Sequence, residues 1–448
     1  MRAVIIGAGN GGSRLANKLY AEGHDVVVVD RDPEALRVLE NELDIMTVQG
    51  YGSDPIALEE AQIEKADVVA GVTNDDCCNI LAGILAKRAG TEYVVARVGN
   101  AGFLNPREFA DLSQMGIDLA INPHQQCAND IVNMLKLPGV LETAGIFENR
   151  ILAAGIEIPA NSPITGIPIK DLSNSALIDK IRFIARIRAE KLSIPFGNDS
   201  FEAGDTIYLV GGLEDIKHFL YWSCPDTTRA DKVIIASGSD TGLELARMLE
   251  TDVQVFVIEE DQQTAVKASD KLDRATVIQG SMLSQDVHQE IGISNRTAFI
   301  AAGKDDEDNM IACLLASKQA AFQTIALLKE PDYVPIVDSL KLIDRTISPH
   351  ISVTNAILQF IRGRNVLAAA ELRYTDGELL EIIIDSKNGW AGKKIADIGM
   401  PKDSIIATVL RQGVIHPAIG SLELQVGDHL AVFSAPSSVK KLQNFCHR

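Results

Sequence analysis

The stretch Val4-Ile5-Ile6-Gly7-Ala8-Gly9-Asn10-Gly11-Gly12 decides the fold, because it joins a short apolar run directly to a glycine-rich loop. Its glycines match the spacing GxGxxG at Gly7, Gly9 and Gly12. In such a loop Gly7 permits the tight turn, Gly9 lets a pyrophosphate approach the backbone, and Gly12 lets the next helix pack against the strand. The N-terminus of that helix offers free N–H groups and partial positive charge to phosphate. The stretch therefore predicts a strand, a phosphate-binding loop and a helix.

A carboxylate supports the same prediction. The next apolar run, Val26–Val29, is followed by Asp30. An acidic side chain at that point can accept hydrogen bonds from both ribose hydroxyls, and it would repel a 2′-phosphate. Loop and carboxylate together favour a dinucleotide or adenine-nucleotide site over a glycine turn that has no ligand.

The rest of the first 122 residues alternates apolar runs with helical patterns, as βαβ units do. The runs are rich in Val and Ile and apolar throughout, which is typical of a parallel sheet covered on both faces. We expect a Rossmann-like, doubly wound α/β domain whose strands are Ala3–Ile6, Val26–Val29, Met46–Val48, Val68–Val72 and Val94–Arg97.

The chain then repeats itself at an offset of 226 to 230 residues, with the matches in the same order. It therefore contains two copies of one unit. The matched segments are Val4-Ile5-Ile6-Gly7 with Val233-Ile234-Ile235-Ala236, Asp75-Asp76 with Asp305-Asp306, Asn79–Ala86 with Asn309–Ala316, and Ile121-Asn122-Pro123-His124 with Ile347-Ser348-Pro349-His350.

Each copy ends in a second, smaller part with short strands and turn signals. Both copies carry Gly-Asp before the last strand, and this pattern predicts a small α+β domain after a linking helix. The expected strands are Ile151–Ile158, Asp179–Arg188, Thr206–Val210, Leu379–Ile384, Ile405–Leu410 and His429–Phe433, and the expected linking helices are Gln125–Leu137 and Val353–Ile361. Four domains result: residues 1–122 (nucleotide-binding), 123–225 (linking helix and small domain), 226–348 (second Rossmann-like domain) and 349–448 (second linking helix and small domain).

The glycine loop of the second copy has changed to Ser237-Gly238-Ser239-Asp240-Thr241-Gly242. Serines replace the first two fingerprint glycines, and Asp240 adds negative charge, although Glu259 still ends the second strand. Two interpretations stay open. Ser237, Ser239, Gly242 and Glu259 belong either to a weaker or altered nucleotide site or to a structural relic.

Composition excludes several classes of function. The net charge of −19 and the 5% aromatic content speak against a nucleic-acid-binding surface, and the charge also disfavours anionic lipid. Six cysteines without a CxxC motif predict neither a disulfide framework nor a zinc site, and a reducing cytoplasm is the natural compartment. The N-terminal apolar run is too short for a secretory signal, and no run approaches a membrane span.

The whole chain resembles the TrkA family, the peripheral subunits of Trk potassium-uptake systems, with tandem RCK (KTN) domains each followed by an RCK C-terminal domain. The duplicated order is more specific than any single motif. The resemblance rests on the glycine loop, Asp30, Gly50-Tyr51-Gly52-Ser53, Val72-Thr73-Asn74-Asp75-Asp76, Ala96-Arg97-Val98, Ile325-Ala326-Leu327-Leu328 and the duplicated Pro-His segment.

The resemblance implies a protein that is cytoplasmic, peripheral on the inner face of the membrane, and docked on a membrane potassium-translocating subunit. It implies binding of NAD(H), in some cases ATP or ADP, assembly into a homotetramer, and no catalysis. Family members often have a second arginine where this chain has Gly99. The implied contacts are Gly7, Ala8, Gly9, Asn10 and Gly11 with phosphate, Gly12 behind them, Asp30 with ribose, Tyr51 and Gly52 near adenine, and Thr73, Asn74 and Arg97 with the far half of the ligand.

The rival class is an NAD-dependent oxidoreductase, which would need a positioned acid–base group and a substrate domain. The second copy leaves no room for a substrate domain, and the eight histidines form no convincing constellation. His124 and His350 each follow a proline at a helix start, which favours a capping or packing role. The cluster Asp305-Asp306-Glu307-Asp308 is more typical of a solvated helix start than of a cation site.

Overall fold

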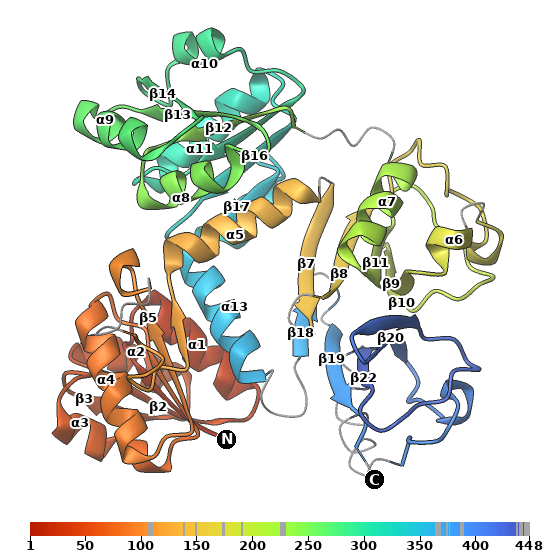
Figure 1. The fold of residues 1–448 in the computed structure, drawn as a ribbon, viewed down its shortest axis with the longest axis horizontal. Coiled ribbons are helices and arrows are strands. Elements are labelled where there is room, and N and C mark those ends of the chain that lie inside the picture. Colours follow the sequence, from red (N-terminus) through yellow and green to blue (C-terminus); the bar gives the residue numbers. More distant parts are fainter. Residues whose placement is uncertain are drawn as a thin grey trace. The chain divides into compact units, whose positions relative to one another are not determined.

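The chain forms two compact units, and each takes one part from each sequence repeat (Figure 1). Unit one comprises residues 1–135 and 230–360, and unit two comprises residues 136–229 and 361–448. The computed structural model describes residues 1–104, 111–137, 139–147, 150–172, 175–189, 191–224, 230–362, 369–372, 375, 377–385, 389–435, 438 and 442. The expected boundary between the copies, at residues 225 and 226, lies outside the described residues.

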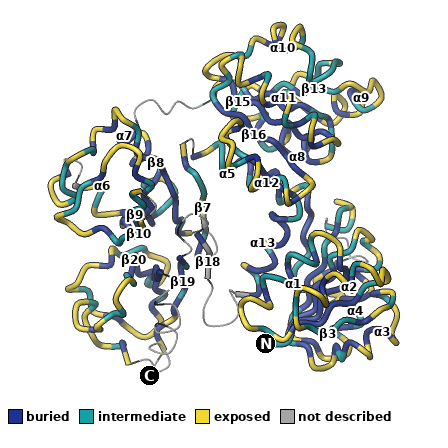
Figure 2. The backbone as a smooth tube through the Cα atoms, turned by 180° about the vertical axis from the view of Figure 1, so that it is seen from behind, coloured by how far each residue is buried: buried dark blue, intermediate teal, exposed yellow. Residues whose placement is uncertain are grey.

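The first Rossmann-like domain has a parallel sheet in the order β3-β2-β1-β4-β5-β6. Its central strands, rich in Val and Ile, are buried, as expected for a sheet covered on both faces, whereas the edge strand Met46–Gln49 is largely exposed (Figure 2). The predicted α/β class is confirmed. The elements are β1 (Arg2–Ile6), α1 (Asn10–Ala21), β2 (Asp25–Asp30), α2 (Pro33–Glu42), β3 (Met46–Gln49), α3 (Pro55–Glu60), β4 (Val68–Gly71), α4 (Asp76–Ala89), β5 (Tyr93–Arg97) and β6 (Leu119–Ile121).

The second Rossmann-like domain repeats that order as β14-β13-β12-β15-β16-β17. Its elements are β12 (Lys232–Ala236), α8 (Asp240–Leu249), β13 (Gln254–Glu259), α9 (Gln262–Lys271), β14 (Thr276–Gln279), α10 (Gln285–Ile291), β15 (Thr297–Ala301), α11 (Asp306–Lys318), β16 (Gln323–Leu327), α12 (Tyr333–Leu340) and β17 (Arg345–Ile347).

The strand alignment between the copies was wrong by one residue. Ile6 is the last residue of β1 and pairs with Val29, whereas Ala236 is the last residue of β12 and pairs with Ile258. Ala236 therefore matches Ile6, not Gly7. With this register, Ser237 takes the place of Gly7, as the alignment of the two loops requires.

The linking helices cross between the two halves of unit one (Figure 1). Helix α5 (Pro123–Lys136) follows the first domain, yet its buried residues Cys127, Ala128 and Ile131 belong to the core of the second. Helix α13 (Pro349–Arg362) follows the second domain, and its Phe360 ring packs edge-to-face on Tyr93 of the first. Both helices begin at a proline, earlier than expected, because the fixed φ of proline suits the first helical turn.

Unit two pairs the small domains through one apolar core. Ile184 and Tyr208 of the first domain pack in the same cluster as Ala407 and Phe433 of the second. The antiparallel sheets have equivalent orders, β7-β8-β11-β9-β10 and β18-β19-β22-β20-β21. The elements are β7 (Val140–Ile146), β8 (Ile151–Glu157), α6 (Ser175–Ile178), β9 (Arg182–Arg188), β10 (Lys191–Ser193), β11 (Thr206–Gly211), α7 (Leu213–Ser223), β18 (Ala369–Leu372), β19 (Gly377–Ile383), β20 (Ser404–Arg411), β21 (Val414–Pro417) and β22 (His429–Ser434).

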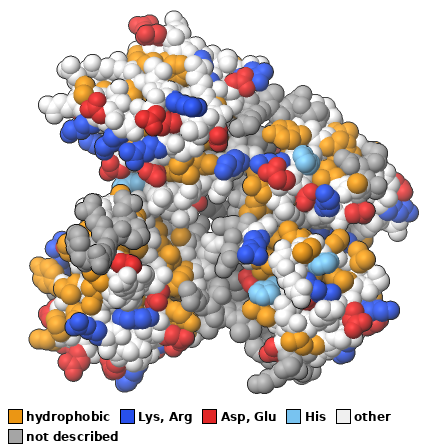
Figure 3. All heavy atoms as spheres, viewed as in Figure 1, with side chains coloured by type: hydrophobic (Ala, Val, Ile, Leu, Met, Phe, Trp, Pro, Cys, Tyr) orange, Lys and Arg blue, Asp and Glu red, His pale blue; other side chains and the backbone are white. Residues whose placement is uncertain are grey.

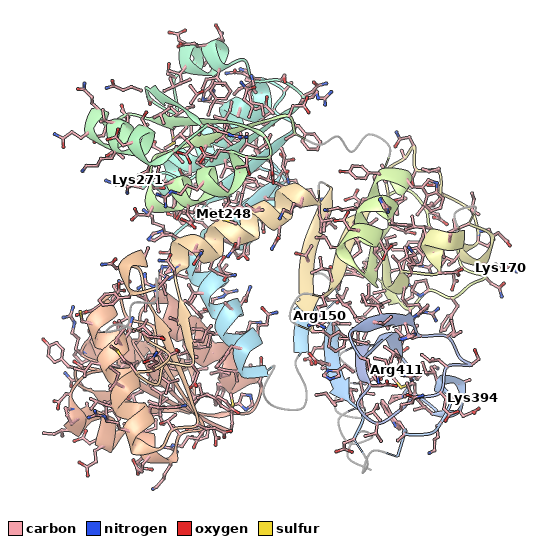
Figure 4. All side chains as sticks on the ribbon, in the orientation of Figure 1. Arg150, Lys170, Met248, Lys271, Lys394 and Arg411 are labelled. Carbon is pink, nitrogen blue, oxygen red and sulfur yellow. The ribbon has the colours of Figure 1, made fainter. Side chains whose placement is uncertain are left out.

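The Gly-Asp pairs noted in the sequence hold a repeated ion pair. Asp205 and Asp428 are buried, and each accepts two hydrogen bonds from an arginine, Arg188 and Arg411 respectively, at 2.6–2.7 Å. Arg411 is labelled in Figure 4. Removing either arginine would leave a buried carboxylate without its counter-charge.

Among the described residues no helix is both long and apolar enough to cross a bilayer. On the face drawn in Figure 3, acidic and basic side chains are interspersed with apolar ones over both units.

Candidate functional site at the first glycine loop

The sheet order reverses between β1 and β4, so the crevice at the carboxyl ends of these strands is the expected ligand position. The glycine loop lies there. Gly7 has φ +112°, and a Cβ on Gly12 would lie 1.8 Å from the Gly7 carbonyl oxygen. A Cβ on Gly9 would have no neighbour within 4 Å. The fold therefore requires the first and last glycines, whereas Gly9 leaves open space above the backbone.

The N-terminus of α1 carries no side-chain cap. Gly9 occupies the N-cap position, and α1 begins with Asn10 and Gly11. The first N–H groups of a helix have no partner within the helix, so an uncapped, glycine-lined start is suited to an anion.

Asp30 lies beside this loop. Its Oδ2 accepts a hydrogen bond from the Ala8 N–H at 2.5 Å, and its Oδ1 accepts one from the Asp32 N–H at 2.8 Å. The structure therefore brings the predicted ribose carboxylate together with the predicted phosphate loop.

The two residues predicted near adenine differ in character. The Tyr51 side chain is 62% exposed, and the Arg31 guanidinium lies 5.9 Å from its ring centroid. Gly52 is buried, and a Cβ there would come within 2.0 Å of Ile6 Cγ2. The structure thus gives Gly52 a packing reason, while Tyr51 remains accessible to a ligand.

Thr73, Asn74 and Arg97 are joined in one hydrogen-bond network at the ends of β4 and β5. Arg97 donates through Nη1 to the Thr73 carbonyl at 2.6 Å and to Asn74 Oδ1 at 2.8 Å. A Cβ on Gly7 would lie 3.1 Å from the Thr73 nitrogen, so the network adjoins the glycine loop. Burial lowers the pKa of Arg97, and the charge of Asp76 opposes that effect.

Asn79, which the sequence marks only as part of the repeated segment, organises this network. Its side chain is fully buried in α4. It accepts from the Thr73 N–H at 3.0 Å and donates to the Thr73 and Arg97 carbonyls at 2.9 Å. A polar residue repeated on the apolar face of a helix was the signal that could have identified it.

The second glycine loop is closed by its own side chains. Ser239 is the N-cap of α8: its Oγ accepts from the Gly242 N–H at 3.2 Å and donates to the Ala302 carbonyl at 2.8 Å. Ser237 has φ +144°, an unusual value for a residue with a side chain. Glu259 accepts from the Gly238 N–H at 2.7 Å, which reproduces the contact of Asp30.

The far half of the second crevice no longer carries the Thr–Asn–Arg network, and Lys304 stands in the place of Asn74. Leu327 ends β16 where Arg97 ends β5, and Gly303 stands in the place of Thr73. Met282, at the position of Gly52, has its Cε 2.8 Å from where a Cβ on Gly303 would lie. Asn309 is retained and donates to the Leu327 carbonyl at 2.8 Å.

The acidic cluster of the second copy forms a helix start. Asp305 caps α11 by accepting from the Asp308 N–H at 3.1 Å. Asp306 accepts from the N–H groups of Lys329 and Glu330 at 2.9–3.0 Å.

The repeated histidines do not cap their helices with their side chains. At the start of α5 the cap is Asn122, whose Oδ1 accepts from the His124 and Gln125 N–H groups at 2.9 and 3.0 Å. The His124 ring instead reaches the second domain, where Nδ1 lies 2.9 Å from Thr241 Oγ1. The capping half of the prediction was therefore wrong for His124, because Asn122, two residues earlier, supplies the cap.

Comparison with known proteins shows which protein family has this architecture. The TrkA-N domain model matches residues 3–123 and 233–349, and the TrkA-C domain model matches residues 153–220 and 379–447. The Trk system potassium uptake protein TrkA of Azorhizobium caulinodans is 27% identical over 99% of this chain and 98% of its own. The protein of the same name from Halomonas elongata is 29% identical over 97% of this chain and 95% of its own.

Solved structures share the fold. The GsuK channel has a TM-score of 0.60 at 16% identity, over 99% of this chain and 78% of its own. The GsuK RCK domain has a TM-score of 0.58 at 16% identity, over 99% of this chain and 94% of its own. Fold and sequence together define a protein with tandem Rossmann-like and small α+β domains. The chain belongs to the TrkA family of Trk potassium-uptake subunits.

Proposed function

We propose that this protein is the nucleotide-responsive subunit of a Trk-type potassium uptake system, and that its first glycine loop binds NAD(H) or an adenine nucleotide. The observation that carries the proposal is the uncapped N-terminus of α1 between Asp30 and the Thr73–Asn74–Arg97 network. Phosphate would lie at the N–H groups of Gly9 to Gly11, and Asp30 would hold the ribose. A structure described as the GsuK channel bound to NAD shares the fold and supports this ligand class.

The subunit would act by binding, without turnover. It would sit on the cytoplasmic face of the membrane as a homotetramer and gate a potassium-translocating partner. A ligand shifts a conformational equilibrium only when it binds the two states with different affinity. The crossed helices α5 and α13 each pack on the other Rossmann-like domain. Closure of the first domain around a nucleotide would therefore shift the second domain.

Titration calorimetry of the purified chain with NAD+, NADH, ADP and ATP tests the proposal. We expect one ligand per chain, because Ser239 caps the second loop and Leu327 replaces the arginine. Binding of two ligands per chain would mean that the second loop is a nucleotide site rather than a structural relic, and absence of binding would overturn the proposed function. A steady rate of NADH oxidation with a small metabolite, lost on mutation of one site residue, would favour an oxidoreductase instead.

A further inference from the structure

Helix α13 of the second repeat packs on the glycine loop of the first. A Cβ on Gly11 would lie 3.5 Å from Nδ1 of His350, the second residue of α13. One turn further, Thr354 donates a long hydrogen bond of 3.5 Å to the Gly11 carbonyl. Two side chains of α13 therefore contact the first turn of α1.

His350 and Arg97 line the same small cavity. Its walls also include Gly11, Val72 and Pro349, and its volume is about 20 Å³, enough for about one water molecule. Both polar side chains are thus placed beside the loop at which phosphate is expected. No described residue hydrogen-bonds to the His350 ring, so the imidazole is available to a ligand.

In the second copy, the corresponding histidine has a hydrogen-bond partner within the protein. His124 approaches Thr241, which stands at the position of Gly11, with 2.9 Å between Nδ1 and Oγ1. In the first copy Gly11 has no side chain to offer. The two histidines are therefore related by the repeat, but one has a protein partner and the other faces the candidate site.

We propose that His350 is a phosphate-contacting residue of the first nucleotide site, supplied by the second repeat. This inference rests on the proposed function and deepens it. An imidazolium hydrogen-bonds to a phosphate oxygen more strongly than a neutral donor does. Bound nucleotide would then hold α13 against α1 through a direct ionic contact. The charge of the ligand would therefore influence the position of the helix that leads out of the second domain.

The contact predicts that nucleotide binding takes up a proton. In the free protein, burial and the positive charge of Arg97 on β5 lower the pKa of His350, while Glu330, after β16, raises it. The ring is therefore mostly neutral near pH 7. A phosphate beside it favours the charged form, so nucleotide affinity increases as pH falls.

The test compares wild type, His350→Gln and the matched control His124→Gln in calorimetry from pH 8 to pH 6. The main probe is NAD+, because the two charges of its pyrophosphate bridge do not titrate in that range. We expect wild type and His124→Gln to bind about fivefold to tenfold more tightly at pH 6, and His350→Gln to be weaker and nearly independent of pH. His350→Gln should lose affinity for ADP in the same way. Its affinity for adenosine, which lacks phosphate, should equal that of wild type.

An equal loss of affinity at every pH, or the same loss for adenosine, would reduce His350 to a packing residue and overturn the inference. An unchanged pH profile in His350→Gln would overturn it as well. If wild type bound no nucleotide at all, the proposed function would fail first, and this inference with it.

Discussion

The two glycine loops descend from one sequence and now differ in what occupies the start of the helix. In the first, Gly9 leaves the N-terminus of α1 uncapped. In the second, Ser239 fills the same position and caps α8 with its hydroxyl. Because a helix start is either capped from within or available to a ligand, one side chain can decide whether a Rossmann-like domain binds or only supports its neighbour.

The contact beneath each loop has not changed. Asp30 accepts from the Ala8 N–H, and Glu259 accepts from the Gly238 N–H. The buried asparagines Asn79 and Asn309 both donate to the end of the fifth strand. The contacts that both copies keep support the fold, and this role leaves Asp30 able to bind ribose as well. The residues that differ between the copies, Gly9 and Arg97, point to the ligand.

The largest effect is expected from Gly9→Val. A Cβ at this position meets nothing within 4 Å, so the domain should fold, while the side chain fills the phosphate position. Losing several hydrogen bonds to charged phosphate corresponds to a loss of about 100-fold or more in nucleotide affinity. The matched variant Ser239→Val should not change nucleotide affinity. Calorimetry measures the affinity of each variant, and an unfolding curve checks that it is folded. Wild-type affinity in a folded Gly9→Val protein would contradict the proposed phosphate site at the first glycine loop.

Asp30→Ala should have the next largest effect, about 30-fold in affinity for a ligand with free ribose hydroxyls, because a charged acceptor for those hydroxyls is lost. Glu259→Ala removes the equivalent contact from the second loop and serves as the control for stability. If both variants lost affinity equally, the second loop would also bind nucleotide.

Arg97→Ala should weaken nucleotide binding about tenfold and uncouple it from potassium flux. The guanidinium can pair with phosphate, and it also holds the Thr73–Asn74 turn in place. The measurement is potassium uptake in cells lacking the native protein, together with affinity in vitro. Leu327→Ala is the control at the equivalent position. Wild-type levels of both uptake and affinity would exclude the proposed role of Arg97.

The smallest effect is expected from Ser239→Ala. Loss of the α8 cap should lower the free energy of unfolding by about 1 kcal/mol, measured in urea, and leave nucleotide affinity unchanged. A second binding event appearing in calorimetry would mean that the hydroxyl alone closes the second loop.

Much of the fold could be predicted from local patterns. The apolar runs located five strands of the first sheet to within one residue at either end, because the β-branched residues buried on both faces of the central strands leave a continuous signal. The edge strands β6 and β17 were missed, since each has three residues and carries no such run. Likewise β10 and β21, three and four residues long, are too short to stand out.

The sequence by itself determined the repeat, the Rossmann-like class, the glycine loop and Asp30, because these depend on local spacing along the chain. Only the tertiary structure decided that α5 and α13 exchange partners, that Asn79 holds the Thr73–Arg97 network, and that His350 faces Gly11. Contacts between residues hundreds of positions apart leave no periodic pattern. They arise because each amphipathic linking helix buries its apolar face on the neighbouring domain.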